Sequence, residues 1–334
     1  MCYNVKRGDF MQDIKPKSLN TLMRHLRNKC NIDINGSTEK KQLLLYGYYH
    51  GYKGYRFYKK SRNLIPFKKF SEIITVAQLD TDLKSLFYPH LMFIETALKN
   101  IVINNIIEGL DSATFDEIYR VRMNKFENPK ATRKNIKLQQ RRLETRNTIY
   151  KITSGNYRKN NPIASHFYNN GQELPIWAIF ESVTLGDFGN FVSCLNKEER
   201  IKILQYLNMY NKTVDTECNL LDNVILTLRP LRNAVAHNNV VFDARFNDRA
   251  ANNNVIHWLE LETGLKTINF ENITDFFVLI VCMLKKLDVQ KTTINRCISN
   301  YTKIIENFKE NSSQSIINCI IDKDTDSKIN AINL

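Results

Sequence analysis

Hydrophobic residues recur along most of this chain with the three- and four-residue spacing of amphipathic α-helices. That spacing gathers apolar side chains on one helix face, whereas a half-buried strand alternates apolar and polar positions. Neither an alternating stretch nor an internal repeat is visible. The pattern predicts an all-α protein built as a helical bundle. We expect helices beginning at Ser18 and Pro175, and others near residues 37–48, 71–81, 82–108, 112–123, 132–151, 186–195, 197–209, 214–237, 271–289 and 291–309.

Prolines, glycines and asparagines mark the expected interruptions between these helices. Pro89 should bend the helix at 82–108 or split its first turn, because proline lacks the N–H that a helix interior needs. Gly155 and Pro162 should flank an asparagine-rich loop. Residues 240–267 are predicted to be irregular, with a short strand or helix near 255–261. A polar tail should follow residue 309.

The helix predicted at 214–237 has one strongly apolar side. At 100° per residue, Asn233 and His237 are neighbours that point away from that side, and Arg232 lies on its flank. Pro230 should kink the helix by some tens of degrees without reversing these directions. The side expected to face the core carries Leu220, Leu221, Val224, Leu228, Leu231 and Val235.

Arg232, Asn233 and His237 are the residue types that metal-free RNA cleavage can use. An arginine can bind the phosphate, an imidazole can transfer protons, and an amide can orient the imidazole. A histidine in a helix is otherwise often a packed or exposed residue with no catalytic part. Asn238 and Asn239 can equally be simple caps, because asparagine tolerates the left-handed backbone that ends helices. Spacing alone leaves these interpretations open.

The net charge of +14 is concentrated in two segments. Residues 15–70 hold 14 lysines and arginines against 2 acidic residues, and residues 120–160 hold 13 against 2, so the remainder is acidic. Such concentration favours a nucleic-acid partner over an anionic membrane surface, although solvated helix faces can also be basic. The expected RNA-binding residues are Lys53, Arg56, Lys59, Lys60, Arg133, Lys134, Lys137, Arg141, Arg142 and Arg146.

Tyrosines alternate with glycines and cations between residues 46 and 60. Interleaved aromatic and cationic side chains suit stacking on unpaired bases beside a charged backbone. A tyrosine-rich packing turn between two helices explains the same pattern equally well. The glycines match no phosphate-loop spacing, so the segment does not indicate a nucleotide-binding loop.

Composition narrows the class of protein further. A chain of 334 residues that is 43% hydrophobic can bury one large or two modest cores. The longest apolar run, Phe276 to Leu284, is too short to span a bilayer. The seven cysteines form no Cys-x-x-Cys pair, so we expect neither a metal site nor a disulfide framework. With no apolar signal segment at the N-terminus, the expected compartment is the cytoplasm.

The order Arg232, Asn233 and then His237 resembles the signature of the HEPN superfamily of α-helical ribonucleases. Other segments resemble one branch, the Abi-like abortive-infection proteins of bacteria (AbiD/AbiF type). Together they span roughly residues 18–245 in that family's order. Many relatives carry a second histidine and an aromatic-Asn-Arg run where this chain has residues 238–243. The similar segments are the Tyr/Gly-rich stretch 40–52, the paired helices of 70–110 with 79–84 and 93–99, and the Pro-x-Trp helix and turn at 174–189.

The resemblance implies a HEPN-like core with additional N-terminal and C-terminal helices. We expect a basic, Tyr-rich region at 1–70, a HEPN-like domain at 71–245 with a basic insertion at about 120–160, and a C-terminal extension at 246–334. Asn238 is a further possible support of the site. Glu95 and Glu181 match family positions near it, although a structural part is the simpler interpretation of both.

The resemblance also implies an activity and partners. We expect a metal-independent endoribonuclease of anti-phage defence, with a bound non-coding RNA as a possible partner and no other cofactor. One histidine cannot readily be base and acid at once, so a homodimer is implied, through the outward-facing Leu226, Pro230 and Asn233. The alternatives are an RNA-binding scaffold with the same fold and no activity, and a toxin controlled by an antitoxin.

Overall fold

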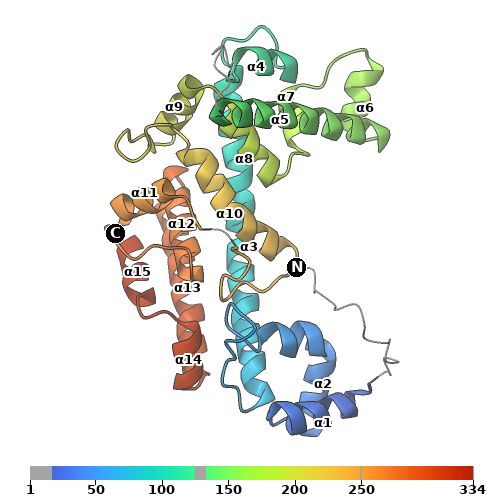
Figure 1. Ribbon diagram of the computed structural model, residues 1–334, viewed down its shortest axis with the longest axis vertical. Helices are drawn as coiled ribbons and strands as arrows, with labels where there is room; N and C mark the ends of the chain where they lie inside the picture. Colours follow the sequence, from blue (N-terminus) through green and yellow to red (C-terminus); the bar gives the residue numbers. More distant parts are fainter. Residues whose placement is uncertain (1–16, 125–132, 249, 334) are drawn as a thin grey trace. The chain divides into compact units, whose positions relative to one another are not determined.

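The structure, a computed structural model, describes residues 17–124, 133–248 and 250–333, apart from the side chain of Lys134. Within these ranges it contains fifteen α-helices and one π-helix, with isolated β-bridges but no sheet (Figure 1). The all-α prediction is confirmed. The chain forms two compact units: one ends at Leu79 and adds Phe308–Cys319, and the other comprises Asp80–Asn307 and the residues from Ile320 onward.

The first unit begins with α1 (Leu19–Cys30) and α2 (Gly36–Tyr46), followed by a π-helix (Gly47–Lys53). The hydroxyl of Ser18 accepts a hydrogen bond from the backbone N–H of Thr21, which confirms the predicted start of α1. The N-cap residue of α2 is Asn35, whereas the sequence pattern placed the cap at Ser37 or Thr38, and the segment after Tyr46 is wound as a π-helix. The small core of this unit includes Met23, Leu26, Leu43, Tyr52 and Tyr55.

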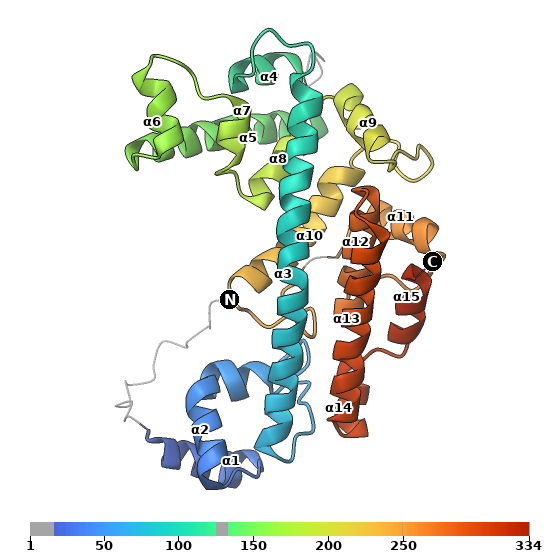
Figure 2. The ribbon, with the colours of Figure 1, turned by 180° about the vertical axis from the view of Figure 1, so that it is seen from behind.

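Helix α3 (Phe70–Ile107) is a single helix of 38 residues, drawn in full in Figure 2. The prediction of two helices divided near residue 81 was wrong. Pro89 lies inside α3 and costs it one backbone hydrogen bond. The helix continues because its apolar side is buried on both sides of that proline, at Phe87 and Leu91.

The second unit continues α3 with seven helices: α4 (Phe115–Val121), α5 (Arg133–Arg158), α6 (Pro162–Asn169), α7 (Ile176–Phe180), α8 (Leu185–Cys194), α9 (Lys197–Tyr206) and α10 (Leu220–Ala236). The predicted loop between Gly155 and Pro162 is present but shorter, at residues 159–161. Gly155 lies within α5, and Pro162 opens α6 behind an Asn161 side-chain cap. Helix α10 starts at Leu220, six residues later than predicted, and packs against α8, α9 and α11.

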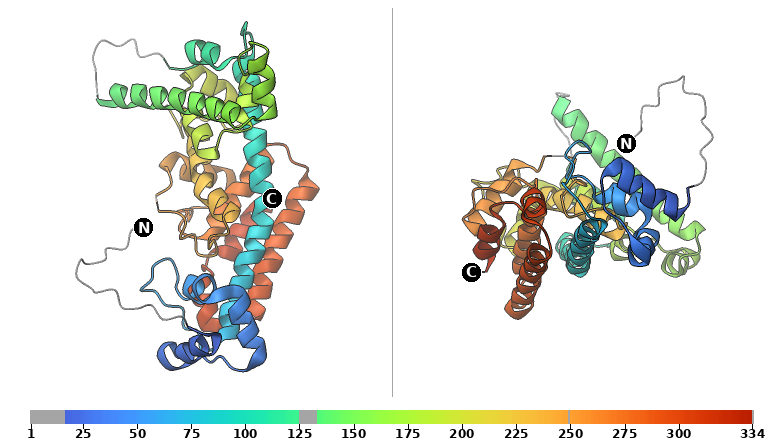
Figure 3. Two further views of the ribbon diagram at one scale, coloured as in Figure 1. Left: turned by 90° about the vertical axis from the view of Figure 1, so that its right-hand side faces the viewer. Right: turned by 90° about the horizontal axis from the view of Figure 1, so that it is seen from below.

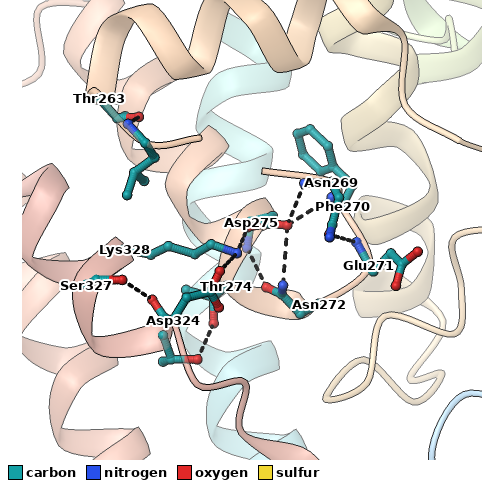
Figure 4. A network of polar contacts seen from close by, with 12 residues as sticks. Thr263, Asn269, Phe270, Glu271, Asn272, Thr274, Asp275, Asp324, Ser327 and Lys328 are labelled. Carbon is teal, nitrogen blue, oxygen red and sulfur yellow. Dashed lines mark hydrogen bonds and ion pairs between the residues drawn. The ribbon is translucent and has the colours of Figure 1, made fainter. Parts of the chain in front are cut away.

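The remaining helices are α11 (Asn253–Thr263), α12 (Ile273–Lys286), α13 (Lys291–Glu310), α14 (Gln314–Ile320) and α15 (Thr325–Ile332). The predicted polar tail is therefore helical. In α15, Lys328 is fully buried and its ammonium pairs with Asp275 at 2.6 Å and Asp324 at 2.8 Å (Figure 4). Helix α14 buries Ile316 and Ile320. The apolar run of α12 is buried in the same core. None of the described helices is both long and apolar enough to cross a membrane.

Candidate functional site

Helix α10 positions the predicted site residues. Its six predicted core residues are all buried, whereas Asn233 and His237 are exposed and Arg232 is half-buried. The predicted division of the helix into a core side and an outward side is confirmed. Pro230 stands inside α10 without ending it. The amphipathic pattern thus leaves the imidazole and the amide accessible from solvent.

The end of α10 is formed by the motif itself. His237 is the C-cap residue, and its backbone N–H donates to the carbonyl of Asn233 at 3.0 Å. Asn238 adopts a left-handed backbone with φ 54°, and the N–H of Asn239 returns to the carbonyl of Ala234 at 2.8 Å. These bonds satisfy carbonyls that the last turn would otherwise leave unpaired. Asn238 and Asn239 therefore do end the helix, as the cap interpretation expects, and this does not prevent them from contributing to the site.

An open cleft of about 680 Å³ lies along this outward side of α10. It brings together the three predicted catalytic residues with side chains from α8 and from the segment after α10. The lining residues are Thr184, Gly186, Asp187, Asn190, Arg229, Pro230, Arg232, Asn233, Ala234, His237, Asn239, Phe246 and Asp248. A cleft with cations, amides and an imidazole is chemically suited to an anionic ligand that must exchange protons.

Arg232 is held by a buried carboxylate. Its Nε donates to Oε2 of Glu95 at 2.8 Å, while Lys99 donates to the other oxygen at 2.9 Å and to the carbonyl of Val183 at 2.6 Å. Glu95, in α3, is only 7% exposed. Part of the positive charge of Arg232 is therefore neutralised within the protein. Glu95 therefore positions the guanidinium of Arg232.

Asn233 faces the arginine. Its Oδ1 accepts from Nη1 of Arg232 at 3.3 Å, whereas the predicted part of this amide was to orient the imidazole of His237. The link between Asn233 and His237 that the structure does contain runs through the backbone. The motif therefore forms a chain from Glu95 through Arg232 to Asn233.

Arg229 belongs to the cleft although its sequence context did not mark it. It stands four residues before Asn233 and eight before His237, so these three share one side of α10. Among the described residues Arg229 makes no ion pair, unlike Arg232. The signal that identifies it is the repeated spacing of four, which extends the motif one turn toward the N-terminus.

Two glycines of α8 allow this helix to approach α10 closely. A Cβ at Gly186 would lie 2.9 Å from Cδ of Arg229, and a Cβ at Gly189 would lie 3.1 Å from Cδ2 of Leu226. The Leu-Gly-Asp-Phe-Gly stretch is thus the first part of α8, and its two glycines leave space for the Leu226 and Arg229 side chains. Leu226, predicted to face outward, is half-buried against α8.

Helix α3 braces the segment after the motif. Oδ1 of Asp80 accepts from the backbone N–H groups of Val241 at 2.6 Å and Phe242 at 2.8 Å. Lys84 pairs with the same carboxyl group at 2.6 Å and donates to Oδ1 of Asn238 at 2.8 Å. Asp80 is fully buried, so its hydrogen bonds with the two backbone N–H groups form in a low-dielectric interior. The two family-like segments of α3 thus secure the end of α10 at two places.

The predicted cations of α5 divide into two kinds. Arg133, Lys137 and Arg141 are exposed, and the side chain of Lys134 lies outside the described residues. The guanidinium of Arg142 lies 3.8 Å from the ring centroid of Tyr119 and donates to its carbonyl, while that of Arg146 lies 5.5 Å from the same ring. Arg142 and Arg146 are therefore partly committed to packing.

The tyrosine-rich segment of the first unit is largely a packing element. Tyr52 and Tyr55 are buried, and Tyr48 packs on Tyr52. The predicted RNA-binding cations lie over this aromatic cluster or beside it: Lys53 is 5.6 Å from Tyr48, Arg56 is 5.9 Å from Tyr52, Lys59 is 5.3 Å from Tyr58, and Lys60 is exposed. The packing interpretation accounts for the buried rings.

Glu181, the other acidic residue that matches a family position, does not reach the cleft. Glu181 is exposed at the end of α7 and does not line the cleft, so the structure brings Glu95 but not Glu181 to the motif. Within the described ranges, no three His, Cys, Asp or Glu side chains gather so as to hold a metal ion.

The protein is all-α, and Arg232, Asn233 and His237 line one cleft at the end of α10. The chain belongs to the Abi-like family, whose model matches residues 41–243, more than half of its length. The family connects the chain with abortive infection, a form of phage defence. The match includes both braces of α3 and all of α10. Neither the curated proteins nor the solved structures contain a match to the chain.

Proposed function

We propose that this chain is a metal-independent endoribonuclease of abortive infection and that it cuts RNA in the α10 cleft. The observation that carries the proposal is that Arg229, Arg232, Asn233 and His237 line one open cleft, with the imidazole exposed. The resemblance to HEPN ribonucleases suggested the same three motif residues independently of the geometry.

RNA supplies its own nucleophile, since its 2′-hydroxyl can attack the adjacent phosphate. The protein must remove that proton, protonate the leaving 5′-oxygen and stabilise the charge on the phosphorane. The His237 imidazole transfers a proton. Arg229, which has no ion pair among the described residues, binds the non-bridging oxygens of the phosphate. Arg232, held by its ion pair with Glu95, is the second cation at the phosphate.

A homodimer completes this mechanism. The cleft of one chain contains a single histidine, whereas concerted acid and base catalysis uses two proton-transfer groups. A second copy that places its own His237 opposite the first supplies the other group. Pro230 and Asn233 remain on the cleft side of α10 for such a contact, while Leu226 is partly covered by α8.

The basic segments bind the RNA outside the cleft. The exposed cations of α5 and of the first unit attract the phosphate backbone, and a structured non-coding RNA is a possible bound partner. If the chain binds RNA but does not cut it, the protein is an RNA-binding scaffold. If the chain is active only after a second protein is removed, it is a toxin controlled by an antitoxin.

A cleavage assay on single-stranded RNA of random sequence tests the activity. In EDTA the full-length chain should yield products with 2′,3′-cyclic phosphate ends. His237→Ala should slow cleavage by about 10²–10⁴-fold, and Arg229→Gln by about 10²-fold, because one charge-stabilising donor is lost. RNA affinity should change little in His237→Ala, because the imidazole is one contact among many.

The matched control is Arg296→Gln, which removes an exposed arginine from α13 in the same unit. It should cleave like the wild type. Arg232→Ala should abolish cleavage, but it removes one of the two cations paired with Glu95, so the stability of this variant must be measured in parallel. Dependence on a divalent metal, or products with 3′-hydroxyl ends, would refute the mechanism.

A further inference from the structure

One side of α5 carries arginines and tyrosines in a single row. Arg142, Arg146 and Tyr150 are spaced by four residues, and Tyr157 follows seven residues later, so all four lie on the same helix face. This face is distinct from the one with Arg141, Thr145 and Thr148, which lines a smaller cavity beside α8. Figure 3 (left) shows α5 lengthwise with α6 at its C-terminal end.

An open groove of about 650 Å³ lies between α5 and α6 at the end of this row. The groove is lined by Tyr150, Lys151, Thr153, Ser154, Tyr157 and Tyr168. The three tyrosines are 45%, 45% and 37% exposed, respectively. Aromatic rings that remain accessible in one groove leave apolar surface that a ligand with flat rings can cover.

Hydrogen bonds hold two of these rings in place. The hydroxyl of Tyr150 donates to Oδ1 of Asp116, and that of Tyr157 donates to Oδ1 of Asn169 at 3.0 Å. Tyr157 and Tyr168 also meet edge to face, with ring centroids 5.4 Å apart. A ligand that stacks on these rings would therefore pay little to immobilise them.

The charge of α5 identifies the kind of ligand. The helix holds eight lysines and arginines against one acidic residue. Lys151 is in the groove itself, while Arg146 lies one turn before Tyr150. Asp116 and Glu173 are the acidic groups close to the tyrosines, and both contribute to raising the pKa of Tyr150, to about 12. Stacking rings at the end of a cationic row are the arrangement that single-stranded nucleic acids bind.

We propose that this tyrosine groove binds successive unpaired bases of a single-stranded RNA by stacking on Tyr150, Tyr157 and Tyr168. Lys151 and the arginines of the row neutralise the phosphates of the same strand. The inference rests on the RNA-binding part of the proposed function and adds a site that lies apart from the α10 cleft. It assigns to α5 the aromatic-cationic surface for which the tyrosine-rich segment of the first unit was the candidate.

Binding of a fluorescent single-stranded RNA with methylated 2′-hydroxyls tests the groove, because such RNA binds but cannot be cut. In the full-length chain, Tyr157→Ala and Tyr168→Ala should each weaken binding about 5- to 150-fold, the range for loss of one stacked base. Tyr168→Phe keeps the ring and should bind like the wild type, and Tyr157→Phe, which keeps the ring but loses the hydrogen bond to Asn169, should lose much less affinity than Tyr157→Ala. Tyr206→Ala removes a tyrosine that is 63% exposed on α9 and should have no effect.

A second ligand separates stacking from charge. An abasic strand of the same length keeps the phosphates and lacks the bases, so the wild type should bind it less tightly than the complete strand. Tyr157→Ala should discriminate less between the two strands. Equal affinities of the alanine variants and the wild type, or a loss in the phenylalanine variants as large as in the alanine variants, would overturn the proposal.

The two proposals fail in different ways. If the chain cuts no RNA but the tyrosine variants lose affinity, the groove stands and the nuclease proposal falls. If unmethylated RNA is cut and the variants bind normally, the groove falls and the nuclease proposal stands.

Discussion

At the scale of single residues, two arginines of similar sequence context have different surroundings. Arg232 is bound to a buried glutamate, whereas Arg229 enters the cleft over Gly186 without an ion pair among the described residues. The motif resemblance identifies the first, and only the geometry identifies the second. Asp222, on the core side of the same α10, is a buried acid whose Oδ1 has no hydrogen-bond partner among the residues that the structure describes.

Asp222 should make stability depend on pH. Burial raises the pKa of its carboxyl group from 3.8 to about 7, against the opposing effect of Arg200. The folded state therefore binds the proton more tightly than the unfolded state does. Its contribution to the free energy of unfolding should be greatest below pH 4 and fall as pH rises to about 7. Asp222→Asn removes this titration and should stabilise the chain at pH 8 by roughly 2–4 kcal/mol.

Urea unfolding of both chains between pH 4 and pH 8 measures the difference. Asp111→Asn, at an exposed position, is the matched control and should show no such trend. A stability difference between wild type and Asp222→Asn that stays constant with pH would contradict the assignment.

At the scale of elements, α3 acts as the support of α10. Its Glu95 holds the helix flank, and its Asp80 holds the backbone after the helix at Val241 and Phe242. Glu95 and Asp80 are fifteen residues apart in one unbroken helix, so both sets of contacts depend on α3 continuing through Pro89. A kink at that proline would misplace one carboxylate relative to the other.

Removal of the Asp80 carboxylate should destabilise the backbone that follows α10. Asp80→Ala removes the carboxylate that accepts from two buried N–H groups and pairs with Lys84, which should lower the free energy of unfolding by about 2–4 kcal/mol. Amide hydrogen exchange should rise at residues 238–242. Ser85→Ala, at an exposed position of the same helix, is the control. Normal protection of residues 238–242 in Asp80→Ala would show that the Asp80 contacts are dispensable.

At the scale of the whole molecule, the chain concentrates its positive charge on few elements. Helix α5 and the first unit hold most of the excess cations, while the rest of the sequence is acidic. This division suits a protein that holds a polyanion on some surfaces and acts on it at another. The single histidine in the cleft leaves the proposed reaction dependent on a second copy.

Mixing experiments test that dependence. Wild type and His237→Ala are combined at constant total concentration and allowed to exchange subunits. If each reaction needs the histidines of two chains, cleavage should follow the square of the wild-type fraction, about a quarter of full activity in an equal mixture. Light scattering of each mixture shows whether dimers are present. A linear dependence would mean that one chain cuts alone.

The sequence by itself determined the helical class, the family and the outward side of α10, because each follows from local periodicity or from the order of short motifs along the chain. Tertiary structure alone decided the bracket between Glu95 and Arg232, the place of Arg229 beside Gly186, and the tyrosine groove. It also decided that α3 continues through Pro89 and that the polar tail forms α15, in which Lys328 is buried. These features depend on side chains far apart in sequence, and burial against a partner can outweigh a local preference for a break or a loop.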